Sequence, residues 1–347
     1  MKKLRVGVIG LNMGRYHLRH YQDSPLCDVV AISEKQPQLL KHVGDEFEIN
    51  KRYEDGFEML QDDTFDIVSV VVPNRYHKAM TLAALDAGAH VLCEKPLALN
   101  AAEGREMVEA AKAAHRRLMI NYTYRFHPSS WALHQQITSG RLGHAYHGRS
   151  VWHRRRGLPP FAGFKAGQKA LQGGGPLVDL GVHRLDLALW YMGFPEPDWV
   201  LGSTYNHLAA EQAHHEGWLF DVEDFASGYI RFRNGASLSL EASWMANIAE
   251  DELMETRVLG TNGGVLQRNR GGEYAFEGAV YYEQEGQHYN LAPAGGASST
   301  NAMAYFADCI VRDEPHMATG EEGVRVLQIL DAIYESAQLG QPVRVDG

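Results

Sequence analysis

Two side chains able to move a proton stand four residues apart near the middle of the chain. Asp179 and His183 follow a glycine run that ends in Pro176. Glycine permits unusual backbone angles and proline is favoured at the first position of a helix, so a helix is expected to begin here. Residues four apart on a helix share one face, and a carboxylate beside a histidine orients its ring and raises its basicity. The pair therefore predicts a proton-transfer site; an ordinary helix aspartate next to a surface or core histidine is the alternative.

The helix that carries this pair is expected over 176–192. Leu177, Leu180, Leu187 and Trp190 recur at helical spacing, and Gly193 with Pro195 closes the pattern.

A lysine able to stabilise an oxyanion lies in the segment Glu94-Lys95-Pro96, directly after a short apolar run. The earlier segment Val71-Val72-Pro73-Asn74-Arg75-Tyr76-His77 ends another such run. Ligands of open α/β sheets bind where the strands end, so both segments are expected at one site. Beside a nicotinamide, the Lys95 ammonium would suit a hydroxyl that gains alkoxide character as it loses hydride. A solvated lysine is the alternative.

The first strand runs into Gly10-Leu11-Asn12-Met13-Gly14, and a helical pattern follows. Such a turn lets backbone N–H groups approach a pyrophosphate at a helix N-terminus. Asn12 replaces the second glycine of the usual fingerprint, and the turn is expected to survive because asparagine tolerates positive φ. Glu34, at the end of the second strand, is placed to accept hydrogen bonds from ribose hydroxyls, which favours NAD over NADP. Ser33 and Lys35 could instead hold a 2′-phosphate, and a solvated carboxylate is the third interpretation of Glu34.

The first 120 residues alternate short apolar runs with amphipathic patterns, which predicts a parallel sheet covered on both faces. Strands are expected at 4–9, 29–33, 67–72, 90–93 and 118–121, and helices at 14–23, 37–47, 75–88 and 100–115.

After Asn121 the expected strands become longer and alternate, which favours an open, largely antiparallel sheet. They lie at 143–153, 198–207, 225–232, 236–243, 253–260 and 279–291, with Asn234-Gly235 as a hairpin turn. Two helices, 299–312 and 320–338, and a tail at 342–345 close the chain.

Composition narrows the class of protein. The chain has 347 residues, enough for two domains, and a net charge of −10, which argues against nucleic acid or an anionic membrane as partner. Its three cysteines have no metal-ligand spacing, so reduced thiols in a cytoplasmic protein are expected. No histidine pair forms H-x-x-x-H, and no metal site is predicted. No signal peptide or membrane span is predicted either.

Residues that could recognise a substrate are harder to single out. Arg154, Arg155 and Arg156 could bind a carboxylate or phosphate, or form a solvated or interface-paired cluster. The aromatic residues Tyr124, Trp152 and Phe161 could form a stacking wall for a sugar or simply pack in the core. The polar run 211–216 is expected to be an exposed loop.

Over essentially its whole length the chain resembles the glucose–fructose oxidoreductase/inositol dehydrogenase (Gfo/Idh/MocA) family. The resemblance rests on five motifs: the Gly10–Gly14 turn, Pro73-Asn74-x-x-His77, Glu94-Lys95-Pro96, Asn121-x-x-Tyr124-Arg125-Phe126-x-Pro128 and Gly174-Gly175-x-x-x-Asp179-x-x-x-His183. It implies a Rossmann NAD(P)-binding domain (1–122) and a substrate-binding α/β domain (123–347). The closing helices of the second domain would be able to pack back on the first, and its sheet often serves as an oligomer interface, here of a homodimer or homotetramer.

The resemblance also implies functional residues. Lys95, Asp179 and His183 would be catalytic. The cofactor would contact Gly10, Leu11, Asn12, Met13, Gly14, Glu34, Pro73, Asn74, His77, Glu94 and Lys95. The residues expected at the substrate are Tyr124, Arg125, Trp152, Arg156, Asp179 and His183. Asn12 departs from the family pattern, which puts the geometry around the pyrophosphate in doubt.

The expected activity is hydride transfer between a secondary hydroxyl of a sugar or polyol and NAD, with NADP as the alternative cofactor. In this hypothesis His183 removes the hydroxyl proton, Asp179 orients the imidazole or holds a neighbouring hydroxyl, and Lys95 stabilises the oxyanion. Two other classes stay open: an enzyme that cycles tightly held NAD to modify glycosides, and a nucleotide-binding sensor without turnover.

Overall fold

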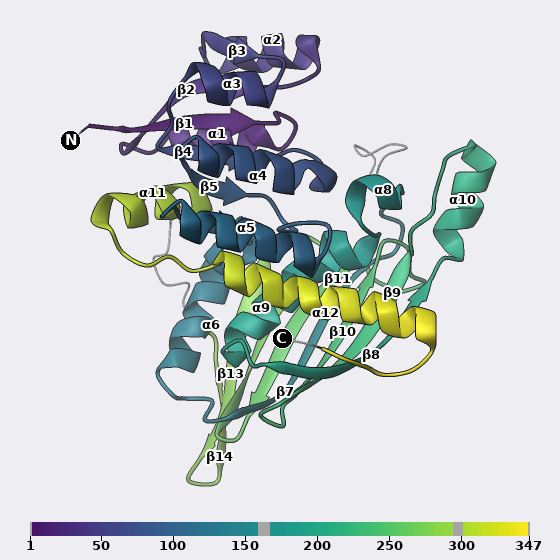
Figure 1. The fold of residues 1–347 in the computed structure, drawn as a ribbon. Coiled ribbons are helices and arrows are strands. Elements are labelled where there is room, and N and C mark those ends of the chain that lie inside the picture. Colours follow the sequence, from purple (N-terminus) through teal and green to yellow (C-terminus); the bar gives the residue numbers. More distant parts are fainter. Residues whose placement is uncertain (1, 159–166, 294–300, 346–347) are drawn as a thin grey trace. The chain divides into compact units, whose positions relative to one another are not determined.

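The chain folds into two compact units, Met1–Tyr122 with Thr300–Leu327, and Thr123–Ser299 with Gln328–Gly347. The structure is a computed structural model that describes residues 2–158, 167–293 and 301–345 (Figure 1). Residues 300–327 of the expected second domain therefore belong to the first unit, which the chain re-enters after completing most of the second.

Unit 1 is built on a six-stranded parallel sheet in the order β3-β2-β1-β4-β5-β6 (Figure 1). Its strands are β1 (Leu4–Ile9), β2 (Cys27–Ser33), β3 (Lys51–Tyr53), β4 (Ile67–Val70), β5 (His90–Cys93) and β6 (Leu118–Ile120). All four residues of β4 are buried, as expected for a strand covered on both faces. Because the strands are parallel, their carboxyl ends lie along one edge, and the order reverses between β1 and β4.

The helices of unit 1 follow the strands one by one. They are α1 (Gly14–Gln22), α2 (Pro37–Glu46), α3 (Gly56–Asp62), η1 (Asn74–Tyr76), α4 (His77–Asp86), α5 (Ala101–Ala113) and α11 (Ala302–Arg312), with the start of α12 (Gly320–Leu339). Side-chain caps start several of them: Asn100 accepts the Glu103 N–H at 3.0 Å at α5, and Asn301 accepts the Ala304 N–H at 2.9 Å at α11.

Unit 2 is built on a nine-stranded sheet in the order β14-β13-β12-β11-β7-β10-β9-β8-β15. Its strands are β7 (Ala145–Arg154), β8 (Pro197–Tyr205), β9 (Phe225–Phe232), β10 (Ser237–Ser243), β11 (Glu252–Gly260), β12 (Gly263–Asn269), β13 (Phe276–Gln284), β14 (Gln287–Leu291) and β15 (Val343–Arg344). Among the paired strands of this sheet only β7 and β10 run parallel. The predicted fold class, a doubly wound parallel sheet followed by a mostly antiparallel one, is confirmed.

Unit 2 also contains helices, several of which contact this sheet. They are η2 (Thr123–Phe126), α6 (Pro128–Thr138), α8 (Lys169–Gln172), the π-helical η3 (Leu177–Gly181), α9 (Val182–Met192), α10 (Leu208–Glu216) and the end of α12. α9 is buried on every side except at its last residue, Met192, and Gly193 ends it at φ +75°. The prediction that Gly193 closes this helix is therefore confirmed.

Several predicted elements need correction. The strand expected at 279–291 is a hairpin, because Glu285 and Gly286 adopt positive φ between β13 and β14. The loop expected at 211–216 lies in α10, whose first backbone N–H groups bond the Asp224 carboxylate. The predicted strand 67–72 ends at Val70. Elements missed altogether include β3, α3, η2, α6, α8 and β12.

No helix in the described ranges is both long and apolar enough to cross a bilayer.

Candidate active site

The turn between β1 and α1 requires glycine at its first position. Gly10 has φ +91°, its N–H donates to the Ser33 carbonyl at 2.8 Å, and a Cβ atom there would collide with the Val71 carbonyl. The turn forms with asparagine in the place of the second glycine, as expected, although Asn12 does not adopt the positive φ that was given as the reason. No side chain caps the N-terminus of α1. A turn that requires glycine, followed by a helix start without a side-chain cap, fits a dinucleotide pyrophosphate.

Glu34 lies directly against this turn. Its carboxylate accepts the Leu11 N–H at 3.0 Å and the Gln36 N–H at 3.1 Å. The Lys35 ammonium lies 5.9 Å from the centre of the Tyr76 ring. A carboxylate at the end of β2 is suited to ribose hydroxyls and repels a 2′-phosphate, so the position agrees with the preference for NAD inferred for Glu34.

His77 joins the segments that follow β4 and β5. Its ring is fully buried, with Nδ1 at 2.7 Å from the Pro96 carbonyl oxygen and Nε2 at 2.8 Å from that of Val72. Burial lowers the pKa of His77, while the two carbonyls and Glu94 oppose that change. Both ring nitrogens bond backbone carbonyls, so His77 links the segment after β4 to the segment after β5. Pro73 and Asn74 lie beside it at the start of η1.

Glu94 and Lys95 follow β5 at the same edge of the sheet. The Glu94 carboxylate lies 2.8 Å from His17 Nε2, accepts the Asn121 amide at 2.6 Å and accepts the Lys95 backbone N–H at 3.1 Å. Burial alone would raise the pKa of Glu94, but His17, Asn121 and Lys95 together lower it to about 2. Glu94 is therefore an ionised group held beside Lys95.

In unit 2 the glycine run builds the entrance to the helix that carries Asp179 and His183. The Glu223 carboxylate accepts the N–H groups of Gly175 at 3.0 Å and Leu177 at 3.1 Å, and the Tyr334 hydroxyl at 2.9 Å. A Cβ atom on Gly174 would collide with the Tyr334 hydroxyl, and one on Gly175 with the Glu223 backbone. The buried carboxylate thus takes the place of a helix cap, and only glycine fits next to it.

Asp179 and His183 do not lie on one regular α-helix as predicted. Residues 177–181 are π-helical, a wider turn that often occurs at functional sites, and α9 begins at Val182. Asp179 Oδ2 accepts the indole N–H of Trp244 at 3.0 Å. The His183 ring is 9% exposed and meets Tyr124 edge-on, with 5.1 Å between ring centroids.

Tyr124 and Trp152, for which a sugar-stacking wall and core packing were both expected, pack in one buried cluster next to His183. The Trp152 ring lies 5.4 Å from Tyr124 and 5.9 Å from His183 between centroids. Its indole N–H donates to Glu252 at 2.5 Å, and Glu252 also bonds Arg154 at 2.8 Å. Phe161, the third aromatic residue expected here, lies outside the described residues.

Three residues near His183 were not singled out from the sequence: Trp244, Glu252 and Arg184. As described above, Trp244 donates to Asp179, and Glu252 accepts the indole N–H of Trp152. Arg184 is fully buried with its guanidinium carbon 4.6 Å from the centre of the Tyr124 ring and 5.3 Å from that of Trp152. Its Nη1 donates to Gln267 at 3.1 Å. Cation–π contacts with the Tyr124 and Trp152 rings stabilise this buried charge. In the sequence, the position of Arg184 directly after His183 is the feature that could have drawn attention to it.

Arg125 and Arg156 lie in different surroundings from those expected of substrate contacts. Arg125 is fully buried and binds both carboxylate oxygens of Asp186, at 2.9 and 2.5 Å. A buried two-point ion pair of this kind commits the guanidinium to the fold. Arg156 is exposed and donates to Asn247 at 2.8 Å, while Arg155 pairs with Asp251. The paired-cluster alternative for the three arginines therefore has structural support within the chain.

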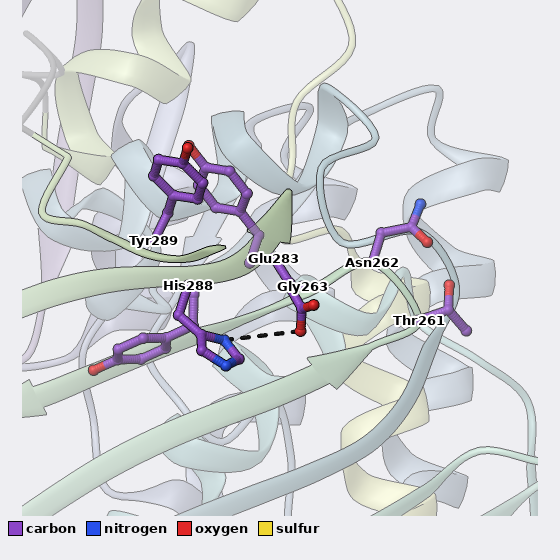
Figure 2. A pocket seen from close by; sticks show the side chains of 8 residues that line it. Thr261, Asn262, Gly263, Glu283, His288 and Tyr289 are labelled. Carbon is purple, nitrogen blue, oxygen red and sulfur yellow. Dashed lines mark ion pairs between the residues drawn. The ribbon is translucent and has the colours of Figure 1, made fainter. Parts of the chain in front are cut away.

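A separate cavity of about 480 Å³ lies at the β13–β14 hairpin (Figure 2). The rings of Tyr282 and Tyr289 stack there with centroids 4.9 Å apart, and His288 lies 3.9 Å from Glu283. None of the predicted site residues lines it. Among the described residues no group of three or more His, Cys, Asp or Glu side chains is arranged to hold a metal ion.

Taken together, a doubly wound parallel sheet with a glycine turn and an acidic residue after β2 is typical of a dinucleotide-binding domain. Residues 4–122 match the oxidoreductase family with an NAD-binding Rossmann fold, and residues 134–345 match the C-terminal alpha/beta domain of that family. The chain therefore belongs to the Gfo/Idh/MocA oxidoreductase family, as the resemblance predicted.

Similar proteins agree with this membership. The chain is 30% identical over 352 residues to a D-glucoside 3-dehydrogenase of Escherichia coli (strain K12), covering 99% of this chain and 97% of the relative. A scyllo-inositol 2-dehydrogenase (NAD(+)) of Bacillus subtilis (strain 168) is 25% identical, with 99% and 97% covered. A structure of levoglucosan dehydrogenase with NADH and levoglucosan superposes with a TM-score of 0.85 at 25% identity, covering all of both chains. The predicted NAD cofactor and the general activity, hydride transfer with a sugar or polyol, are confirmed.

Proposed function

We propose that this enzyme oxidises a secondary hydroxyl of a sugar or glycoside, with His183 as general base and Lys95 as the cation that stabilises the developing oxyanion. The observation that carries the proposal is the surroundings of His183: a buried imidazole walled by Tyr124 and Trp152, one turn after a carboxylate fixed by Trp244. Aromatic faces and fixed polar groups of this kind suit a sugar ring.

Each residue has a distinct task in this proposal. His183 takes the hydroxyl proton, and Asp179, held at Oδ2 by Trp244, orients the imidazole or binds a neighbouring hydroxyl. Lys95 stabilises negative charge on the substrate oxygen. Burial raises the pKa of Tyr124, although Arg184 opposes this change, so Tyr124 keeps its proton and can donate to the sugar. Bound NAD supplies the hydride acceptor at its nicotinamide ring.

The Gly10–Gly14 turn and Glu34 would hold the cofactor, the turn at the pyrophosphate and Glu34 at the adenosine ribose. Because Glu34 is an acceptor aligned by two backbone N–H groups, a 2′-phosphate would meet its negative charge. We therefore infer that NAD is preferred over NADP.

We expect the purified enzyme to form NADH, followed by absorbance at 340 nm, when NAD is supplied with a panel of inositols, aldoses, glycosides and sugar acids. With NADP the rate should fall at least about tenfold, the effect of about 1.4 kcal/mol. Turnover of a glycoside without net NADH would instead indicate the NAD-cycling class. Binding of NADH with no turnover of any compound would contradict the proposed function.

We further propose a homodimer or homotetramer that associates through the nine-stranded sheet. Strand pairing places Leu201, Tyr229 and Arg149 in one row across β8, β9 and β7, with Ser239 between Tyr229 and Arg149. Leu201 and Tyr229 are 44% and 39% exposed, while neighbouring Gly228 faces Ile333 of α12 on the opposite side. Exposed apolar side chains beside charges of both signs suit a self-complementary interface.

Light scattering after size exclusion should give two or four times the 38.7 kDa chain mass. A Leu201→Asp, Tyr229→Asp double variant should shift the mass toward one chain, whereas the exposed Lys112→Ala should leave it unchanged. A monomer at micromolar concentration would contradict this proposal.

The three cysteines are all free and buried, which supports a cytoplasmic location.

A further inference from the structure

We propose that His17 is a positioning residue of the active site: with Ser69 and Tyr21 behind it, it holds the Glu94 carboxylate in the orientation that fixes Lys95. This inference rests on the proposed role of Lys95. The motifs described above assign no task to His17, Ser69 or Tyr21.

The four side chains form one continuous hydrogen-bonded row inside unit 1. The Tyr21 hydroxyl lies 2.9 Å from Ser69 Oγ, which lies 3.2 Å from His17 Nδ1, and His17 Nε2 lies 2.8 Å from Glu94 Oε1. Tyr21, Ser69 and His17 are all fully buried, and only Glu94, with its side chain 15% exposed, reaches the surface of the site. The row thus connects the interior to the residue that precedes Lys95.

The carboxylate sets the direction of the hydrogen bond at the Glu94 end of the row. A carboxylate only accepts, so His17 Nε2 carries a proton and donates to Glu94. On the other side of the ring, Nδ1 lies against the Ser69 hydroxyl, which lies against the Tyr21 hydroxyl. Burial raises the pKa of Tyr21, so its hydroxyl keeps its proton. The row therefore holds the His17 ring so that its Nε2 proton points at Glu94.

Glu94 passes this orientation to Lys95 through the backbone. Its second oxygen, Oε2, accepts the Lys95 N–H at 3.1 Å, while Asn121 donates to Oε1. Asn121 is itself fixed, because its N–H donates to the Cys93 carbonyl at 2.8 Å. Without His17 a buried carboxylate would lose its main donor, and burial would then favour its protonated form. A neutral Glu94 would accept the Lys95 N–H more weakly and leave the lysine less well placed.

The first test is made on the full chain without cofactor. We label glutamate carboxyl carbons with ¹³C and assign Glu94 by its loss in Glu94→Gln. From pH 8 to 4 the wild-type Glu94 signal should remain that of a carboxylate. In His17→Leu it should titrate inside this range, and in His17→Gln, whose amide can donate to Glu94, the carboxylate signal should be restored. A Glu94 signal in His17→Leu that matches the wild type across this range would overturn the proposal.

The second test uses turnover. His17→Leu should lower kcat about ten- to hundredfold, the effect of losing a hydrogen bond to a charged group, and this loss should grow as the pH falls and Glu94 becomes protonated. His17→Gln should recover most of both changes, and Tyr21→Phe should produce a smaller change in the same direction. His20→Gln on the same helix is the matched control. Superimposable kcat profiles for wild type and His17→Leu would overturn the proposal.

Circular dichroism checks that each variant folds, and Ser69→Ala replaces His17→Leu in both tests if the latter does not. An inactive wild type would count against the proposed function alone, because the carboxyl titration requires no turnover. An active wild type with an unaltered Glu94 titration in the variants would count against the role of His17 alone.

Discussion

His183→Ala should lower kcat by about 10²- to 10⁴-fold, the range contributed by a general base, while the Kd for NADH stays within about twofold of wild type. The reason is that the imidazole is proposed to act on the substrate hydroxyl and has no proposed cofactor contact. Steady-state rates at 340 nm and quenching of protein fluorescence by NADH measure the two quantities separately.

The matched control is His144→Ala, an exposed histidine in the loop before β7, which should retain full activity. A variant with wild-type kcat would remove His183 from the mechanism. Loss of activity together with loss of the circular dichroism signal would be repeated with His183→Asn, which preserves most of the buried volume.

Lys95→Ala should damage two functions at once. Loss of one preorganised cation at a developing oxyanion typically costs about 10²- to 10³-fold in kcat, and we expect a loss of that size. In addition the Kd for NADH should rise, because Lys95 follows Glu94 at the sheet edge where cofactors bind. A change in both kcat and Kd distinguishes Lys95→Ala from His183→Ala, for which only kcat is expected to change.

Lys95→Arg should recover NADH binding more fully than kcat, since a guanidinium keeps the charge but presents it in a different geometry. Lys112→Ala, an exposed lysine of α5 that pairs with Glu109 at 3.0 Å, is the matched control and should behave as wild type. An unchanged kcat in Lys95→Ala would exclude the oxyanion role, and an unchanged Kd would exclude the cofactor role.

The parallel sheet of unit 1 could be predicted because its strands are continuous apolar runs separated by amphipathic helices. β4 and β5 were recognised in this way, and the turn after β1 by its glycines. Short elements with few apolar residues gave no such periodic pattern. The three residues of β3 and the seven of α3 were therefore missed. The polar segment that forms α10 was predicted as a loop. Two of its N–H groups and that of the preceding His207 bond Asp224, eight residues beyond the end of the helix.

Part of the candidate site could also be predicted from local patterns in the sequence. Short motifs drew attention to Lys95, Asp179 and His183, because their chemistry is carried by residue type and local spacing. The roles of Arg125 and His77 depend on partners distant in sequence: Arg125 pairs with Asp186, and His77 bonds the carbonyl of Pro96. Nothing near either residue in the sequence indicates these partners.

The amino-acid sequence alone determined the family, the two-sheet α/β class and the residues whose types can bind NAD and move a proton, since these follow from local patterns. Tertiary structure decided what each polar group contacts. It set the π-helical turn at Asp179, the cation–π burial of Arg184 and the row from Tyr21 to Glu94. The physical reason is that buried charges and hydrogen bonds are satisfied by groups brought together from distant segments, and such pairing leaves no periodic signal in the chain.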